Sequence, residues 1–437
     1  MVITDPVHGI IHLNPIQNDL LHTVEIQRLN AIHQLGMTFQ VYPCAHSMRF
    51  SHALGVSYLA GRIGSHVLSG ADSMPGIGDS ERATIDLLTA AGLLHDICHT
   101  PWSHTLEPLL HEITGRTHMD LTIDILTGKT RFPIRGAGRI PQILRDHGVD
   151  PAEVAALITS SFRGSQFIQQ IIFGEVDADT LDYLKRDFFF TGVSFGHIDI
   201  DRLIETMVID NGRLYFKVKG LQAVRDFLNA RVEMYSAVYL HKTTRITDMM
   251  LLRLARKSIL ELKEFPEFWS MTDDEILSAF LNDSRSDYVR DMAWRLKFRQ
   301  DLFKRTYHIE AGAITIEQRK SLLDLYRQFP DSRQFAQHLE QNIERRAGIP
   351  QGYVIVDLVS MATLMSEQRF QELDIQFIDR DRRTYRFAEL DRAFASYIRD
   401  AQPSRSLLSV YVPREYTECS RSVIPELLSE IGYASTN

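Results

Sequence analysis

Apolar residues recur at the spacing of an α-helix through much of this chain, and that spacing sets the fold class. Residues three and four apart are apolar in the ranges 15–35, 52–68, 80–95, 222–241 and 246–262. Each such stripe must be buried against a neighbouring element, so the pattern predicts a mostly α fold of packed helices. Clusters of Gly, Pro and Ser in 69–79 and 128–141 predict surface loops.

A smaller amount of β-structure is predicted towards the C-terminus. Asn211-Gly212 between two extended segments is a strong signal for a β-hairpin. Helical character is expected to return after it, through about residue 348. Strands are expected at 353–358, 374–378 and 407–412, with a helix near 387–399 between them. We therefore expect three parts: a helical core over 1–260, a helical extension over 261–348 and a mixed α/β C-terminal lobe over 349–437.

Composition argues against several classes of protein. The chain has 48 Lys plus Arg and 56 Asp plus Glu, a net charge of −8, whereas nonspecific nucleic-acid binders need a broad basic surface. No run of 18 apolar residues could span a membrane, and the N-terminus lacks the pattern of a secretory signal. Three cysteines are too few for a disulfide framework. We expect a cytoplasmic protein with no membrane partner and no specific nucleic-acid binding.

The histidines are concentrated at one end of the chain. Twelve of the 17 lie at or before His118. Imidazole is the common neutral metal ligand and also the side chain that exchanges protons near neutral pH. The concentration therefore indicates metal chemistry, acid–base chemistry or both.

A candidate metal site lies where apolar helices meet polar residues. Ala90, Ala91 and Gly92 would let another helix approach closely, and His95-Asp96 follows them. One His-Asp pair is weak evidence, because such a dipeptide is expected about once by chance. Further metal ligands are therefore expected from two other helices.

His52 stands among apolar helical neighbours, and Asp179 begins a later amphipathic stretch. Taken singly, His52 could be a core histidine and Asp179 a helix N-cap. Taken with His95 and Asp96, they form a set of two nitrogen and two oxygen ligands that suits one divalent ion with open positions for water and a phosphate oxygen. Mg, Mn, Fe, Co, Ni and Zn all remain open.

With these residues in place, the chain resembles the HD-domain metal-dependent phosphohydrolases, and more closely their deoxynucleoside triphosphate triphosphohydrolases. Animal members carry a sterile-alpha-motif domain before the core, whereas we expect this chain to start at the catalytic part. The segments that carry the resemblance are Thr4-Asp5-Pro6-Val7-His8-Gly9, Gln27-Arg28-Leu29, Gln34-Leu35-Gly36, 49–56, 95–104, 179–187 and Tyr239-Leu240-His241-Lys242.

The resemblance implies an HD-domain core over 1–260 and a role for each matching residue. The implied metal ligands are His52, His95, Asp96 and Asp179. His104 would donate a proton to the leaving oxygen, His99 would lie beside the α-phosphate and His118 would support it. The alternative for these three is that they are polar residues lining a helix bundle.

The resemblance also implies the substrate contacts. Arg49 and Arg231 would bind phosphate, Tyr183 and Asp187 the sugar, and Gln34 and Leu35 would lie under the 3′-hydroxyl. Tyr239 would crowd the 2′ position and so favour deoxyribose. The implied reaction is attack of water on the α-phosphorus, which releases deoxynucleoside and inorganic triphosphate.

Some positions depart from the family pattern. Thr180 stands where relatives have a phosphate-binding lysine, which leaves open an HD phosphatase or phosphodiesterase acting on nucleoside monophosphates or other phosphoesters. His22 and Asn30 stand where the animal protein has an acidic and a basic residue of an allosteric guanine pocket, although Gln27 is retained. Met1 stands where a lysine would contact a regulatory phosphate, so activation by a nucleotide also stays open. The resemblance implies a homo-oligomer, a dimer or tetramer. A third alternative is a nucleotide-binding regulator whose output is its oligomeric state.

Overall fold

The computed structural model describes residues 1–70, 78–196, 198–310, 313–329, 331–358, 374–400 and 406–433. The chain forms two units whose segments alternate along the sequence. The first comprises Met1–Met234, Phe265–Ser278 and Leu373–Asp400, and the second comprises Tyr235–Glu264, Ala279–Glu372 and Ala401–Asn437. Neither unit is a single stretch of chain. The division into three serial parts that the sequence suggests stays a prediction.

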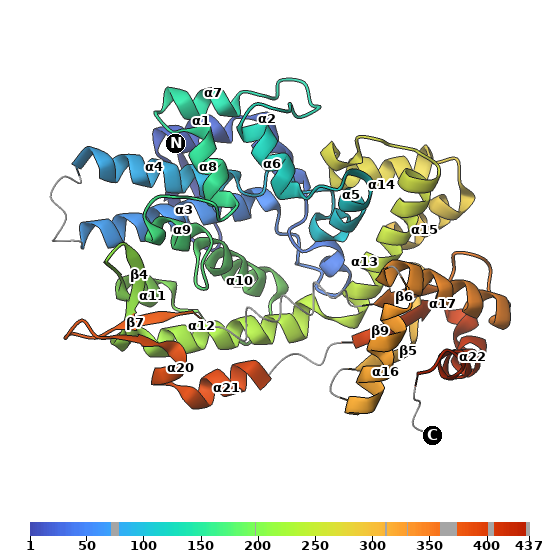
Figure 1. Ribbon diagram of the computed structural model, residues 1–437. Helices are drawn as coiled ribbons and strands as arrows, with labels where there is room; N and C mark the ends of the chain where they lie inside the picture. The colour runs from blue at the N-terminus through green and yellow to red at the C-terminus, as the bar shows by residue number, and fades with distance from the viewer. Residues whose placement is uncertain are drawn as a thin grey trace. The chain divides into compact units, whose positions relative to one another are not determined.

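Three helices lie at the centre of the first unit: α3 (Arg49–Ser69), α4 (Gly78–Leu94) and α10 (Ala178–Thr191). Helices α3 and α4 run side by side (Figure 1). A Cβ added at Gly92 of α4 would lie 2.9 Å from the Cα of Ser57 in α3. The small residues at 90–92 thus let two helix backbones approach closely, as the sequence predicts.

Helix α10 packs on α3 through a second glycine. A Cβ at Gly55 would lie 1.8 Å from Oδ1 of Asp182 in α10, so no larger residue fits there without a shift of the carboxylate. This close contact places the first residues of α10 beside the first residues of α3.

The remaining helices of the first unit surround this centre. They are α1 (Pro15–Leu21), α2 (Val24–Arg28), α5 (Glu107–Thr114), α6 (His118–Leu126), α7 (Ile140–Asp146), α8 (Pro151–Ile158), α9 (Gln166–Ile172), α11 (Ile200–Thr206), α12 (Leu221–Met234), α20 (Phe387–Leu390) and α21 (Arg392–Asp400). Most bury one apolar stripe, as the helical spacing of apolar residues requires.

Two small sheets belong to the first unit. Strands β1 (Val2–Asp5) and β2 (Gly9–His12) form an antiparallel pair. The other sheet has the order β3-β4-β7-β8, with bounds Met207–Asp210, Arg213–Lys217, Gln376–Ile378 and Thr384–Arg386. The predicted hairpin is its β3–β4 pair, whose turn residues Asn211 and Gly212 both have positive φ.

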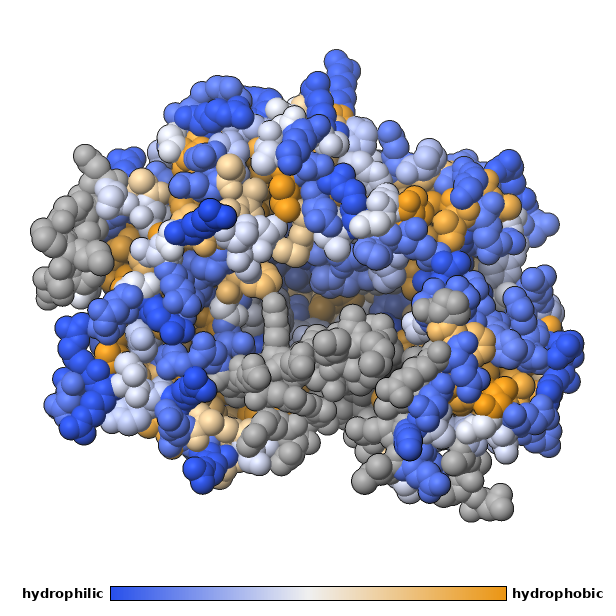
Figure 2. All heavy atoms as spheres, in the orientation of Figure 1, coloured by the Kyte–Doolittle hydropathy of each residue, from blue (hydrophilic) through white to orange (hydrophobic). Residues whose placement is uncertain are grey.

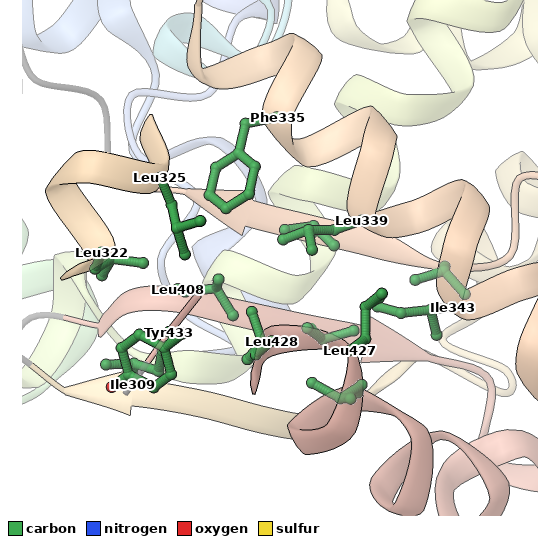
Figure 3. Packing of buried hydrophobic residues seen from close by; sticks show 14 of the residues in the cluster. Ile309, Leu322, Leu325, Phe335, Leu339, Ile343, Leu408, Leu427, Leu428 and Tyr433 are labelled. Atoms are coloured by element: carbon green, nitrogen blue, oxygen red, sulfur yellow. The ribbon is translucent and has the colours of Figure 1, made fainter. Parts of the chain in front are cut away.

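The second unit is built around an antiparallel sheet of order β5-β9-β6, with bounds Lys304–Glu310, Ser406–Val412 and Ile355–Leu358. Its helices are α13 (Lys242–Ala255), α14 (Asp273–Asn282, whose first residues belong to the first unit), α15 (Asp287–Phe298), α16 (Ile316–Arg327), α17 (Ser332–Ala347) and α22 (Thr417–Glu430). Leu339 of α17 and Leu427 and Leu428 of α22 bury against Leu408 of β9 (Figure 3).

Several expectations about elements are confirmed and several need correction. Helices over 52–68 and 80–95 and strands within 353–358, 374–378 and 407–412 are present. The stretch 15–35 is divided, because Thr23 begins a second helix, and 387–399 is divided at Asp391. The uninterrupted helical character expected up to residue 348 is wrong, because β5 interrupts it. Strand β7 pairs in parallel with β4, and both strands belong to the first unit.

No helix in the described part of the chain is both long and apolar enough to cross a bilayer. Hydrophilic residues cover most of the face seen in Figure 2, and hydrophobic residues appear there in small separate groups.

Candidate metal and phosphate site

Helix ends in the first unit bring four predicted ligands together. His52 lies in the first turn of α3, His95 and Asp96 directly follow α4, and Asp179 lies in the first turn of α10. The Nε2 atom of His52 is 3.1 Å from Oδ1 of Asp179 and 3.6 Å from Oδ2 of Asp96. The Nε2 atom of His95 is 3.3 Å from that Asp96 oxygen and 3.8 Å from the Asp179 oxygen. The Asp96 and Asp179 oxygens thus each lie within 4 Å of both imidazole nitrogens.

Both imidazoles are oriented by contacts at their other nitrogen. Nδ1 of His52 lies 2.8 Å from Oδ2 of Asp182, and Nδ1 of His95 lies 2.9 Å from the carbonyl oxygen of Gly92. An Nδ1–H that donates to oxygen leaves the lone pair on Nε2, the atom directed at the centre. The protein thus favours the tautomer that a metal ion requires.

Asp182 is a positioning carboxylate that the sequence analysis did not single out. It accepts hydrogen bonds from Arg186 through Nε and Nη2, each at 2.9 Å, and Nε2 of His8 lies 2.6 Å from it. Arg186 also donates to Asp5, at 2.9 Å. The N-terminal motif Asp5 to His8 therefore has a structural role, because it supports the carboxylate that orients His52. The three-residue spacing of Asp182 from Asp179 was the available signal.

Charge in this cluster suits a cation. Burial raises the pKa of the Asp182 carboxyl, but Arg186, His52 and His8 outweigh burial and hold that pKa well below its usual range. Burial lowers the pKa of His52, yet Asp179 and Asp182 raise it to about 10. The two carboxylates that favour a proton on this imidazole would equally favour a metal cation at Nε2 in place of that proton.

The donor set fits a divalent ion. Nε2 of His95 is buried and has no hydrogen-bond partner among the described residues. Ligand atoms of His52, His95 and Asp96 lie within 4.8 Å of one another, and so do those of Asp96, His99 and His118. Imidazole nitrogen with carboxylate oxygen is a set that accepts Mn, Fe, Co, Ni or Zn and, less readily, Mg.

Arg49 lies against this centre with part of its guanidinium uncommitted. It is 2% exposed, pairs with Asp96 through Nη1 and donates from Nε to Oγ of Ser103, at 2.7 Å. Its Nη2 is buried with no hydrogen-bond partner in the part of the chain that the structure describes. A buried cationic N–H group of this kind is suited to an anionic oxygen.

Three further histidines gather beside Asp96. Nε2 of His99 lies 3.2 Å from Oδ1 of Asp96, and the ring of His118 stacks on that of His99 with centroids 3.9 Å apart. Burial, and then Arg49 and His118, keep the pKa of His99 well below its usual range, so its ring is neutral. His104 is largely exposed, with 69% of its side chain accessible.

Glu107 joins two of these histidines and was missed by sequence reasoning. One carboxylate oxygen lies 3.0 Å from Nδ1 of His104, and the other contacts Nδ1 of His118. Burial raises the pKa of Glu107, but the bonds to the two histidines outweigh it, so the carboxylate stays charged. A glutamate three residues after a histidine was the only local signal for it.

One cavity of about 240 Å³ collects most of the predicted site. It is lined by Gln34, Arg49, His52, His95, Asp96, His99, His104, His118, Met119, Ile158, Ile172, Phe173, Asp179 and Tyr183. Oε1 of Gln34 is buried there with no hydrogen-bond partner among the described residues. Metal ligands, imidazoles, a guanidinium and an amide thus share one space.

The structure does not bring every predicted contact into this cavity. Leu35 and Asp187 are not among its lining residues, although Asp187 is buried one helical turn beyond Tyr183. Arg231 is buried at the end of α12 in the first unit. Tyr239 belongs to the second unit, where its ring lies against Tyr235 with centroids 5.1 Å apart.

Family models match most of the chain. The HD domain matches residues 49–180, and the HD associated region matches residues 198–429. The solved structure of a hypothetical protein from Aquifex aeolicus superposes with a TM-score of 0.70 at 26% identity, covering 97% of this chain and 99% of that one. A phosphohydrolase from Bacteroides thetaiotaomicron gives 0.66 at 23% identity, with 95% and 100% covered, and shows the same fold.

Curated relatives extend the comparison. An uncharacterized protein of Bacillus subtilis is 36% identical over 59% of this chain and 55% of its own length. Deoxynucleoside triphosphate triphosphohydrolase SAMHD1 of Homo sapiens is 28% identical over 57% of this chain and 43% of its own length. The chain thus spans about half the length of these relatives. With both family models matched and the His/Asp cluster assembled, the chain belongs to the HD-domain phosphohydrolases with an HD-associated region.

Proposed function

We propose that this phosphohydrolase converts deoxynucleoside triphosphates into deoxynucleoside and inorganic triphosphate. The observation that carries the proposal is the sharing of one cavity by the predicted metal ligands, the uncommitted Nη2 of Arg49 and the uncommitted Oε1 of Gln34. Metal ligands and a guanidinium would be enough for the hydrolysis of any phosphoester. A hydrogen-bond acceptor for a sugar hydroxyl, beside them, favours a nucleotide.

His52, His95, Asp96 and Asp179 would hold a divalent ion, which when bound supplies Lewis-acid activation of water and neutralises phosphate charge. Arg49 would hold a phosphate oxygen and orient the α-phosphorus for in-line attack. His104 would donate a proton to the leaving 5′-oxygen as its bond to phosphorus breaks. The Glu107 carboxylate lies 3.0 Å from Nδ1 of this imidazole and so holds the ring in place for that step.

Supporting roles follow from the same geometry. Neutral His99 would donate or accept a hydrogen bond at the α-phosphate without adding charge, and His118 stacks against it. Tyr183 would contact the sugar from the cavity wall. Leu35, Asp187, Arg231 and Tyr239 keep the roles that the resemblance implies, as part of this proposal.

A phosphatase or phosphodiesterase acting on monophosphates is the second candidate. Thr180 favours it: the residue after Asp179 is a buried neutral side chain rather than a cation that could hold the outer phosphates. The two functions share the ligands and the leaving 5′-oxygen and differ in the length of the phosphate chain.

Product analysis separates these candidates. Protein reconstituted with Mn²⁺ should release deoxynucleoside and triphosphate from the four deoxynucleoside triphosphates, and His95→Ala should lower kcat at least about 100-fold because an imidazole ligand is lost. His111→Ala, an exposed histidine on α5, is the matched control and should leave the rate unchanged. Orthophosphate from monophosphates, without turnover of any triphosphate, would establish the second candidate instead.

The oligomeric state and any nucleotide activator also belong to this proposal. We propose a homo-oligomer, and leave nucleotide activation to direct test by repeating the assay with GTP or a second deoxynucleotide. At the positions that differ from the family's guanine pocket, Nδ2 of Asn30 donates to Oε1 of Gln27 at 3.3 Å. Gln27 itself donates to the carbonyl oxygen of Leu21 at 2.7 Å. A rate that does not change on adding the second nucleotide would reject activation. Full biological effect from Asp96→Ala would favour the nucleotide-binding regulator.

A further inference from the structure

A segment from late in the chain braces the loop that carries His104. Residues Phe265–Ser278 belong to the first unit although the segments flanking them belong to the second. Buried Arg28 donates to the carbonyl oxygens of Trp269, Ser270 and Met271 at 2.7–2.9 Å, and to that of His99 at 2.9 Å. The late segment is thereby tied to the start of the loop after the His-Asp pair.

Asp273 makes the second connection. Its side chain is 3% exposed, and its two oxygens accept three hydrogen bonds. Oδ1 accepts from the backbone N–H of Trp102 at 2.5 Å. Oδ2 accepts from the backbone N–H of His33 at 2.7 Å and lies 2.8 Å from Nδ1 of the same residue. One carboxylate thus fixes the main chain two residues before His104 and one residue before Gln34.

The backbone that Asp273 holds is strained. Trp102 has φ 59° and ψ 24°, and Ser103 has φ 56°. Consecutive left-handed residues other than glycine are unfavourable and persist only where the surroundings hold them. Other contacts also hold this turn. Trp102 stacks on His33, with centroids 5.3 Å apart, and Ser103 accepts from Arg49 and donates to the carbonyl oxygen of His33. Oγ1 of Thr100 donates to the carbonyl oxygen of Ser103 at 2.7 Å.

This geometry determines where His104 lies. His104 directly follows the two left-handed residues, so a relaxation of either towards the right-handed region would turn its side chain away from the cavity. Its side chain is 69% exposed, so its placement depends on the backbone, on the Glu107 carboxylate and on an edge-to-face contact with the ring of His99, with centroids 4.8 Å apart.

We propose that Asp273 is a positioning residue for proton donation to the leaving group. By holding Trp102 in the left-handed conformation, it places the His104 imidazole beside the leaving 5′-oxygen. The inference rests on the proposed role of His104. In that step a water oxygen bonds to the α-phosphorus and gives up a proton to solvent, the P–O5′ bond breaks, and its electron pair goes to O5′. O5′ receives the His104 proton, and the exposed imidazole then regains a proton from solvent.

A sulfur substitution isolates this step. A 5′-thiolate leaves without a proton, whereas a 5′-alkoxide needs one, so a defect in proton donation slows the oxygen substrate selectively. The probes are thymidine 5′-triphosphate and thymidine 5′-monophosphate, each with oxygen or sulfur at the bridging 5′ position. Whichever phosphate chain length the enzyme accepts, the same 5′ bond breaks, so the comparison does not depend on which of the two candidate functions is correct.

The variants are Asp273→Asn, its exposed neighbour Asp274→Asn as matched control, and His104→Ala. Asp273→Asn should lower kcat for the oxygen substrate at least about tenfold, change kcat for the sulfur substrate less than about threefold and leave metal content unchanged. Asp274→Asn should match wild type. The oxygen-to-sulfur rate ratio, measured on one preparation, does not depend on the fraction of protein that is folded.

Three outcomes would overturn the inference. Equal loss on both substrates would make Asp273 merely structural, and no loss would make it irrelevant. The double variant should be no slower than His104→Ala alone, because both act on one step, so additive losses would also contradict it. If His104→Ala itself shows no selective loss, the proposed general acid fails, which is a different result from the failure of Asp273.

Discussion

Two buried carboxylates, Asp182 and Asp273, hold the side chains and backbone on which the proposed chemistry depends. From the sequence, His52, His95, Asp96 and Asp179 could be selected because residue type and helical position point to metal chemistry. Asp182 and Asp273 could not, because each acquires its partners only when distant segments meet: His8 lies 174 residues from Asp182, and His33 lies 240 residues from Asp273.

The orienting carboxylate gives a prediction about metal affinity. Asp182→Asn keeps the shape of the side chain but weakens its contacts to His52, His8 and Arg186, so metal affinity should fall about 10- to 100-fold. Competition with a chelating dye measures the affinity. Asp201→Asn, which changes an exposed partner of Arg62, is the control. Metal affinity equal to wild type in Asp182→Asn would show that the contact to His52 has no orienting role.

At the scale of elements, strong periodicity predicted helices well and their ends poorly. The 15–35 stretch is divided because Thr23 adopts an extended conformation and begins α2, a local change that the apolar spacing does not reveal. Strand β5 was missed because it is an edge strand of polar sequence, Lys304–Glu310, that forms through pairing with β9.

The loop after α13 contains a buried carboxylate, Glu264, that makes the stability of the protein depend on pH. Glu264 accepts hydrogen bonds from the backbone N–H of Arg285 at 2.8 Å and from Ser284 at 3.0 Å, and it contacts Ser258. Burial raises its pKa, but these bonds outweigh burial and lower it to about 2. A lowered pKa contributes stability above about pH 4.5, which is lost as pH falls from there towards 2.

Glu264→Gln should therefore lower the free energy of unfolding by about 1–2 kcal/mol at pH 7. The difference from wild type should shrink as pH falls from about 4.5 towards 2, because the unfolded wild type takes up a proton on this carboxylate in that range while the folded protein does not. Denaturant unfolding at a series of pH values measures it, with the exposed Glu267→Gln as control. A difference that stays constant down to pH 3 would contradict the assignment.

At the scale of the whole molecule, local patterns identified the fold class but not the connectivity. The chain leaves the first unit after Met234, returns for Phe265–Ser278, and returns again for the segment that contains β7. The parallel pairing of β4 with β7, Phe216 opposite Phe377, joins residues that no local signal connects. A serial division into three parts is what a reading of consecutive segments yields, and it does not express this alternation.

In the proposed reaction, water attacks the α-phosphorus of a deoxynucleoside triphosphate, so the fate of the water oxygen tests it. It is measured by ³¹P NMR and mass spectrometry of the products formed in H₂¹⁸O. We expect one ¹⁸O atom in the inorganic triphosphate, at a terminal phosphorus, and none in the deoxynucleoside. Label in orthophosphate, with the diphosphate or monophosphate left behind, would show that water attacks a different phosphorus.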